Sequence, residues 1–223
     1  MFRLIRCFTG CILVALAVGC ATPSTEVISD PEGAFIKVNG NGLGTSPQNF
    51  TFDLGKLPVY QVSASKDGYF DSNLTVDANS NAIQNGVLKM ALQPDPSWQE
   101  TTVSDATNRW LHVQVSAGIT QDEAWQKIID SVTSRYASLE QLDSSSGYLR
   151  STLISRTFKN PMTGDFTIRT QFLGAIASKD PLVYKMQIRA EQSTPSGDWV
   201  PYDRVFKEDA QLIDELQNRL GLK

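Results

Sequence analysis

The sequence is poor in the residues on which many enzyme and metal sites depend. Its 223 residues include three cysteines and one histidine. The cysteines are Cys7, Cys11 and Cys20, all near the N-terminus, and His112 stands alone. Without paired cysteines or a second histidine, the chain has no zinc-ligand spacing, disulfide framework, Cys–His dyad or redox CxxC motif. We therefore expect no metal and no cofactor.

Positive charge is also scarce. Lysine and arginine number 20 against 24 aspartates and glutamates, which gives a formal net charge of -4. A nucleic-acid-binding protein gains its affinity largely from excess lysine and arginine that neutralise phosphates. Nucleic acid is therefore excluded as an expected partner. Hydrophobic residues at 41% and charged residues at 20% indicate a globular chain that can bury a core.

The chain begins with an apolar run that is too short to be a permanent membrane span. Basic residues precede the run at 7–18, which is the plan of a secretory signal. The run ends in LAVGC at 16–20, which resembles the lipobox of bacterial lipoproteins. The resemblance implies that residues 1–19 are a signal peptide and that Cys20 carries a diacylglycerol on sulfur and a fatty acid, such as palmitate, on its new amine.

The residues after Cys20 bear on where such a lipoprotein would go. Two or more acyl chains make a stable anchor where one is marginal. Ala21 and Thr22 stand where an aspartate would retain a Gram-negative lipoprotein at the inner membrane. The resemblance thus implies a lipid anchor in the outer membrane, facing the periplasm, with residues 20–26 as a lipidated tether. The alternatives are an ordinary cleaved signal with an incidental cysteine, or an uncleaved helix.

Residues 27–93 have the pattern of a small β domain. Short runs of period-two character alternate with turn residues, which predicts a small antiparallel all-β sandwich. Asn-Gly at 39–40 and at 41–42 fits hairpin turns better than a phosphate-binding loop, because no helix start follows these residues. The expected strands are 27–28, 34–38, 50–52, 59–65, 73–76 and 87–92.

An ordered set of motifs lies within the same residues. They are Pro31-Glu32-Gly33-Ala34, Val38-Asn39-Gly40, Gly44-Thr45-Ser46-Pro47, Tyr60-Gln61-Val62, Lys66-Asp67-Gly68-Tyr69 and Leu88-Lys89-Met90-Ala91-Leu92. In this order they resemble the PEGA domain, a small β-sandwich of bacterial envelope proteins, over residues 27–93. The resemblance implies an extracytoplasmic adhesion or scaffold module that has no catalytic residues to transfer.

A second domain is expected over residues 99–223. Pro94 and Pro96 predict an extended linker at 94–98, with few contacts across it and hence a mobile hinge. Beyond the linker, a strand at 111–115 precedes a helix that opens with a capping box at Thr120 and carries an apolar stripe to Leu139. Three strands follow before a last helix, which predicts an α+β domain with an antiparallel sheet and two helices on one face. Those three strands are expected at 148–158, 166–176 and 182–189.

The sheet face opposite those helices is the candidate binding surface. Alternation places polar, aromatic and mostly cationic side chains there, and such a face on an acidic protein suits a glycan, peptidoglycan or an acidic envelope protein. The alternative is an ordinary solvated face, or one covered by the loop 193–202 with Trp199. The candidate residues are Trp110, His112, Arg169, Lys185 and Arg189.

These patterns predict a non-enzymatic, lipid-anchored envelope lipoprotein that acts as a periplasmic binding or scaffold module. Its partners are the membrane, through acyl chains on Cys20, and envelope proteins or peptidoglycan. The alternative is a cell-wall enzyme, acting on glycan or peptidoglycan, or an accessory to one, through a groove in the second domain. A deep cleft with converging carboxylates, or a carboxylate partner for His112, would favour the alternative. No catalytic residue is predicted.

Overall fold

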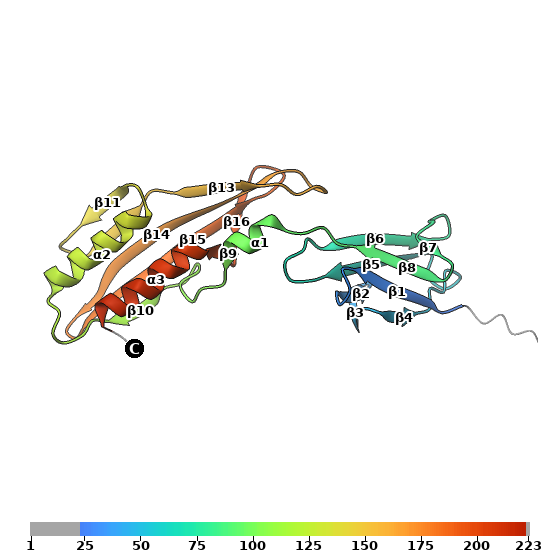
Figure 1. The fold of residues 1–223 in the computed structure, drawn as a ribbon, viewed down its shortest axis with the longest axis horizontal. Coiled ribbons are helices and arrows are strands. Elements are labelled where there is room, and N and C mark those ends of the chain that lie inside the picture. Colours follow the sequence, from blue (N-terminus) through green and yellow to red (C-terminus); the bar gives the residue numbers. More distant parts are fainter. Residues whose placement is uncertain (1–22, 222–223) are drawn as a thin grey trace, which may run out of the picture.

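The computed structural model describes residues 23–221 of the chain, so Cys20 and the predicted signal peptide lie outside the described residues. The described chain is predominantly β, with three helices and several sheets. Its strands fall into two groups that follow one another along the longest axis of the molecule, as Figure 1 shows. No helix in residues 23–221 has the length and apolar character needed to cross a membrane.

The first group consists of two four-stranded sheets, with strand orders β4-β1-β8-β7 and β3-β2-β5-β6. Alternate residues of both sheets point inward and form one hydrophobic core, which includes Val27, Leu88, Ile36 and Val62. The strands are β1 (Thr25–Asp30), β2 (Phe35–Val38), β3 (Asn41–Thr45), β4 (Gln48–Phe50), β5 (Val59–Ser65), β6 (Ser72–Asp77), β7 (Ile83–Gln84) and β8 (Val87–Ala91).

One strand pair departs from the predicted antiparallel arrangement. β1 and β8 are parallel neighbours, with Val27 opposite Leu88. Parallel neighbours need a long crossover connection, and here the other sheet and its loops supply it. The prediction was therefore wrong for this pair, because periodicity reveals strands but not the direction in which distant strands meet.

The hairpin turns follow their local chemistry. Asn39 and Gly40 have φ angles of 52° and 80°, which fits the Asn-Gly turn predicted between β2 and β3. The second Asn-Gly pair, at 41–42, instead lies in β3. Asn85 and Gly86, with φ angles of 52° and 78°, make a comparable turn between β7 and β8, inside a segment expected to be loop. Glycine accepts positive φ at no steric cost, and asparagine tolerates it well.

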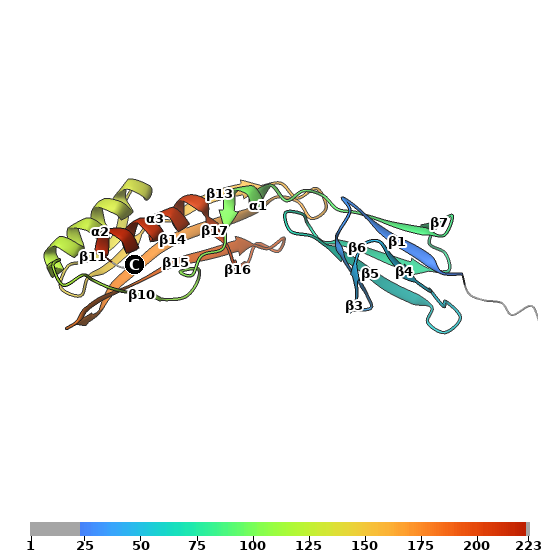
Figure 2. The ribbon, with the colours of Figure 1, turned by 60° about the horizontal axis from the view of Figure 1, so that its bottom comes forward.

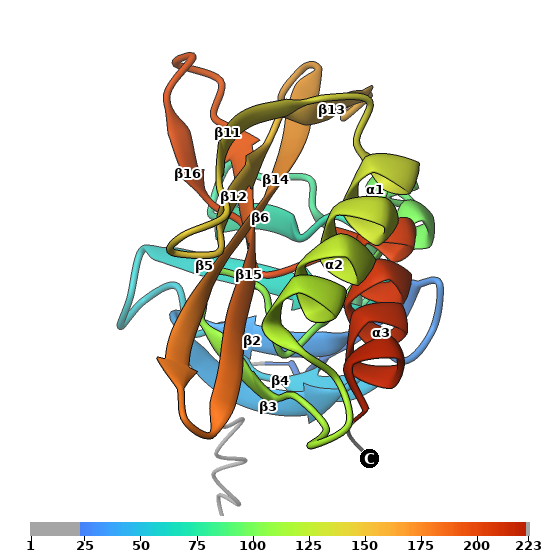
Figure 3. The same cartoon turned by 90° about the vertical axis from the view of Figure 1, so that its left-hand side faces the viewer.

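The second group is a seven-stranded antiparallel sheet of order β10-β15-β14-β12-β11, in which β13 also pairs with β14 and β16 with β15. Helices α2 and α3 lie along the same face of this sheet (Figures 2 and 3). A two-stranded sheet, β17-β9, accompanies them. The elements are α1 (Pro96–Glu100), β9 (Thr101–Thr102), β10 (Leu111–Gln114), α2 (Gln121–Arg135), β11 (Leu139–Asp143), β12 (Tyr148–Ser151), β13 (Ile154–Phe158), β14 (Phe166–Lys179), β15 (Leu182–Ser193), β16 (Trp199–Pro201), β17 (Val205–Phe206) and α3 (Lys207–Leu220).

The helices cover one face of the seven-stranded sheet and bury alternate residues of its long strands. Ile128 and Val132 of α2 join Phe172, Met186 and Ile188 of the two long strands in one hydrophobic core. Because successive strand side chains point to opposite faces, the residues between these core positions must face away from the helices. The packing of α2 and α3 therefore decides which side chains reach the candidate binding surface.

Several element boundaries differ from the sequence prediction. The capping box is confirmed, since the Thr120 hydroxyl accepts from Glu123 N at 3.3 Å and Glu123 accepts from Thr120 N at 2.9 Å. The helix ends at Arg135, however, and Leu139 belongs to β11. The predicted strand 148–158 is two strands, β12 and β13, separated at residues 152–153.

The segment 94–98, expected to be a free linker, contains the start of α1. The Asp95 side chain caps this helix by accepting from Ser97 N at 2.8 Å. Trp98 stacks on the guanidinium of Arg204 at 3.7 Å, and the edge-to-face pair of Phe70 with Phe166 joins the two strand groups at 5.9 Å between ring centroids. Of these contacts the Phe70–Phe166 pair is the one that joins the two strand groups, and the mobile hinge stays a prediction.

Candidate functional site

The strand register places the predicted binding residues on the face of the long sheet that the helices leave uncovered, which we call the outer face. His112 of β10 lies opposite Lys185 of β15. Farther along β15, Arg189 lies opposite Gln171 of β14, and Glu191 opposite Arg169. All six alternate with core residues of the same strands, so they share one face.

Trp110 and Lys185 form a pair at one end of the outer face. Trp110 directly precedes β10, and the Lys185 ammonium lies 4.9 Å from its ring centroid. The Trp110 side chain remains 40% exposed. The lysine therefore covers part of the ring while the rest of the indole stays open to solvent. His112, next to Lys185 in the register, is exposed as well.

A second tryptophan–cation pair lies at the other end of the face. Trp199 of β16 stacks on the guanidinium of Arg169 at 3.7 Å, and Arg169 donates through Nε to Glu191 at 2.7 Å. The Trp199 side chain is 38% exposed. In the sequence, Trp199 entered only the alternative in which the loop 193–202 covers this face, and its stacking on Arg169 was not predicted. The turn residues of the hairpin at 194–198, followed by Trp199, were the available signal.

Between the two pairs the outer face is mostly polar, apart from Leu173, which lies opposite Gln187. Gln171 is buried and donates to the Ser151 carbonyl at 2.8 Å and to Glu140 at 3.2 Å. Arg150 is ion-paired with the same Glu140 at 3.1 Å. Arg189 is exposed, and no carboxylate in residues 23–221 lies within ion-pair distance of it or of Lys185. Those two cations are thus the uncompensated charge of the outer face. An anionic group of a ligand would therefore have its most favourable electrostatic interaction at these two residues.

The backbone edge of β15 is occupied along its length. β10 pairs with one end and β16 with the other. The loop before β10 fills the gap, because Asn108 N donates to Ile188 O at 2.9 Å while the Asn108 side chain both accepts from Ala190 N and donates to Ala190 O at 2.9 Å. Asn108 takes a φ of 54° to do so. A partner can therefore contact the side chains of β15 but cannot pair with its backbone edge.

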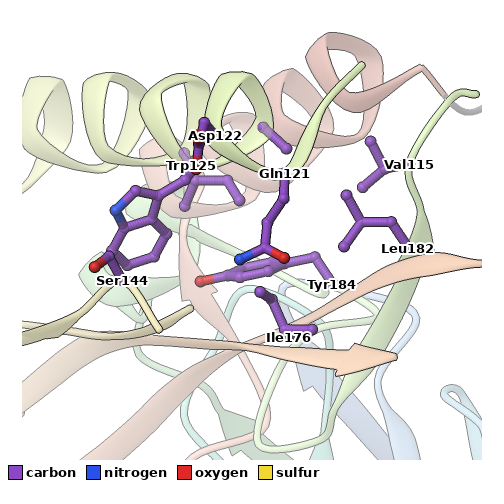
Figure 4. A pocket seen from close by; sticks show the side chains of 10 residues that line it. Val115, Gln121, Asp122, Trp125, Ser144, Ile176, Leu182 and Tyr184 are labelled. Carbon is purple, nitrogen blue, oxygen red and sulfur yellow. The ribbon is translucent and has the colours of Figure 1, made fainter. Parts of the chain in front are cut away.

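A small apolar cavity lies on the other side of the sheet, beneath the start of α2 (Figure 4). Trp125, Tyr184, Ile176 and Leu182 line it, and its volume is about 10 Å³. A cavity of this size holds about one water molecule. It belongs to the packing of the core, and Figure 4 shows Gln121, Asp122 and Ser144 beside the apolar side chains that line it.

Two further observations concern metal ligands and His112 in residues 23–221. No group of three metal-ligating side chains is present in those residues. His112 has no carboxylate among its hydrogen-bond or ion-pair partners there. The residues brought together are Trp110, His112 and Lys185 at one end and Arg169 at the other, with Arg189 between them. The lipidation site, Cys20, is outside the described residues.

Comparison with known families assigns only the first part of the chain. The family model for the PEGA domain matches residues 22–93, which contain the motifs seen in the sequence and all of the strands from β1 to β8. No curated protein matches the chain. The match does not extend to the seven-stranded sheet. The chain therefore carries a PEGA domain at residues 22–93.

Proposed function

We propose that this protein is a non-enzymatic, lipid-anchored lipoprotein of the outer membrane, facing the periplasm. In this proposal Cys20 carries the acyl chains, residues 27–93 form a PEGA β-sandwich, and residues 99–223 form an α+β domain that binds a component of the envelope. The PEGA match supports an extracytoplasmic module, and the LAVGC sequence at 16–20 supports the anchor.

The observation that carries the binding role is the pair of half-exposed tryptophans on the outer face, each with a cation stacked on it. Tryptophan and arginine are enriched among the residues that contribute most to interfaces. Cation–π attraction contributes about 0.5–1 kcal/mol at exposed sites. This attraction offsets the conformational entropy that the cationic side chain loses when it is held on the ring. Trp110 and Trp199 therefore present an ordered surface on a face that no helix covers.

The position of β1 suits the proposed anchor. The start of β1 lies at the end of the PEGA domain that is far from the seven-stranded sheet (Figure 1). Acyl chains on Cys20 would thus insert at this end of the molecule. The PEGA domain would then stand between the membrane and the binding face and would hold the outer face away from the lipid.

Replacing Cys20 by serine is expected to abolish fatty-acid labelling and to move the protein from the membrane fraction to the soluble fraction, since the overall acidic chain has no electrostatic attraction to an anionic leaflet. The measurement is metabolic labelling with a fatty acid, combined with membrane fractionation. Cys11→Ser, inside the apolar run, is the matched control and should label normally. Normal labelling of the Cys20→Ser variant would end the lipoprotein proposal.

Photo-crosslinking in intact cells tests the binding role. A photoreactive residue at Gln187, on the outer face, should give specific crosslinks. The same residue at Gln211, an exposed position of α3, should not. The Lys185→Glu/Arg189→Glu variant should lose these crosslinks and stay folded, because neither cation has an ion-pair partner in residues 23–221 and surface substitutions usually change stability by less than about 0.5 kcal/mol. Equal crosslinking from both positions, or none, would refute a binding role for this face. Hydrolysis of peptidoglycan by the purified protein would support the enzyme alternative instead.

A further inference from the structure

We propose that the ligand of the outer face is a linear glycan chain bearing carboxylate groups, which lies along β15 between Trp110 and Trp199. This inference rests on the proposed function, because it assumes that the outer face binds a partner. It adds the chemical class and the shape of that partner. The argument uses the closed edge of β15, the spacing of its cations and the positions of the two tryptophans.

The closed edge of β15 rules out one common way of binding an extended chain. A peptide that adds itself as a strand needs a row of free backbone donors and acceptors. On β15 these groups are taken by β10, by Asn108 and by β16. A ligand of the outer face must therefore be bound by the side chains that project from this face.

The cations of the face follow a line. Lys185 and Arg189 are four residues apart on one strand and point to the same side, so they are separated by about 13 Å. Arg169 lies beside the next outward position of β15, where Glu191 partly neutralises it. Glu140, another carboxylate on this surface, is ion-paired with Arg150. Two uncompensated charges at this spacing fit a ligand with repeated anionic groups better than a compact anion.

The tryptophans mark the two ends of the line. Trp110 directly precedes Leu111, the partner of Met186, and Trp199 is the partner of Ser193. The backbone positions of the two tryptophans are therefore roughly 20 Å apart along β15. Protein–protein hot spots usually have aromatic residues at the centre and polar residues at the rim. The outer face has the reverse order, with Arg189 and its β14 partner Gln171 between the two tryptophan positions.

This order matches the chemistry of an acidic sugar chain. Each indole offers a flat apolar surface at one end with a polar N–H at its edge. Amide and guanidinium donors between them suit hydroxyl and carboxylate groups. The two indoles lie at opposite ends of this face, beside Lys185 and Arg169. An extended chain that spans both tryptophans therefore fits better than a single sugar.

Titration of the full chain, purified in detergent, with oligogalacturonates of increasing length tests the inference. Affinity should rise with length until the chain spans both tryptophans, and should fall as salt concentration rises. The Lys185→Glu/Arg189→Glu variant, and Trp110→Ala combined with Trp199→Ala, should each weaken binding by about tenfold or more. Lys37→Glu/Lys207→Glu, an equal charge change at exposed positions elsewhere, should bind as the parent does.

Neutral oligosaccharides of equal length and poly-glutamate complete the test. Both should bind at least about tenfold more weakly than the uronate chains. Equal binding of poly-glutamate would overturn the glycan assignment in favour of an acidic protein, and affinity independent of length would overturn the extended mode. If the Lys185→Glu/Arg189→Glu variant loses its crosslinks in cells while no uronate binds the parent, the glycan inference fails and the binding face stands. If neither effect is seen, both fail.

Discussion

Replacing Gly174 by alanine is expected to destabilise the protein by about 3 kcal/mol, at the upper end of the usual cost of overpacking. Gly174 lies in the middle of β14, buried between β12 and β15. A Cβ at this position would lie 2.8 Å from both Cε1 and Cζ of Tyr184. Tyr184 has little freedom to move, because it is buried and its hydroxyl donates to the Gly147 carbonyl at 3.0 Å.

Urea unfolding followed by circular dichroism measures this effect as a shift in the transition midpoint. Gly118→Ala is the matched control, since its Cβ would meet no atom within 4 Å and its φ is not positive. The control should leave the midpoint unchanged or raise it slightly. An unchanged midpoint for Gly174→Ala would mean that Tyr184 can leave its site at little cost.

The Arg135→Met variant is expected to lose about 3 kcal/mol of stability. Asp209 of α3 is fully buried, and it accepts from Arg135 Nε at 2.8 Å and from the Tyr136 hydroxyl at 3.1 Å. Removing one partner of a buried ion pair leaves an uncompensated charge in the core, which is costly. Arg219→Met removes an exposed ion pair with Glu215 and should cost less than about 1 kcal/mol.

The stability loss in Arg135→Met should depend on pH. Burial already raises the pKa of the Asp209 carboxyl above its usual value, and loss of the Arg135 charge, which lowers it, would raise it further. A carboxyl with a raised folded-state pKa binds its proton more readily in the folded state, so stability increases as pH falls through that pKa. The deficit relative to the parent should thus be largest at neutral pH and shrink as the pH is lowered.

Unfolding at about pH 5 and about pH 8 tests this sign. The window avoids Asp143, whose pKa is lowered to about 2 by hydrogen bonds from Ser146 and Ser145. The stabilising contribution of Asp143 is lost only as the pH falls from its ordinary pKa towards that value. A deficit of the same size at both pH values would show that the Asp209 charge is not the cause of the loss.

Local signals in the sequence predicted the local features well. Asn39-Gly40 requires positive φ and makes the expected turn. The capping box at Thr120 starts α2 where expected, because its hydrogen bonds involve only neighbouring residues. Alternation along β14 and β15 also placed Arg169, Lys185 and Arg189 on one face. Each of these features depends on residues that are close in the chain or on simple strand geometry.

Features that depend on distant residues were not visible in the sequence. The parallel pairing of β1 and β8 joins residues about sixty positions apart. The pairing of Trp199 with Arg169 needs a hairpin to fold back over β15, and the contact of Phe70 with Phe166 joins two strand groups. The break between β12 and β13 comes from their different partner positions on β14, which residue pattern alone does not encode.

The parallel pairing of β1 with β8 has a mechanical consequence. The chain enters the PEGA domain at the start of β1 and leaves it after the end of β8, at opposite ends of two adjacent strands that run the same way. A pull between an anchored N-terminus and a held second domain would act along these strands in shear. It would load all the pairs from Glu26 with Val87 to Asp30 with Ala91 at once. In a hairpin the same pull would open the hydrogen bonds one by one, so the parallel order suits a spacer that bears tension.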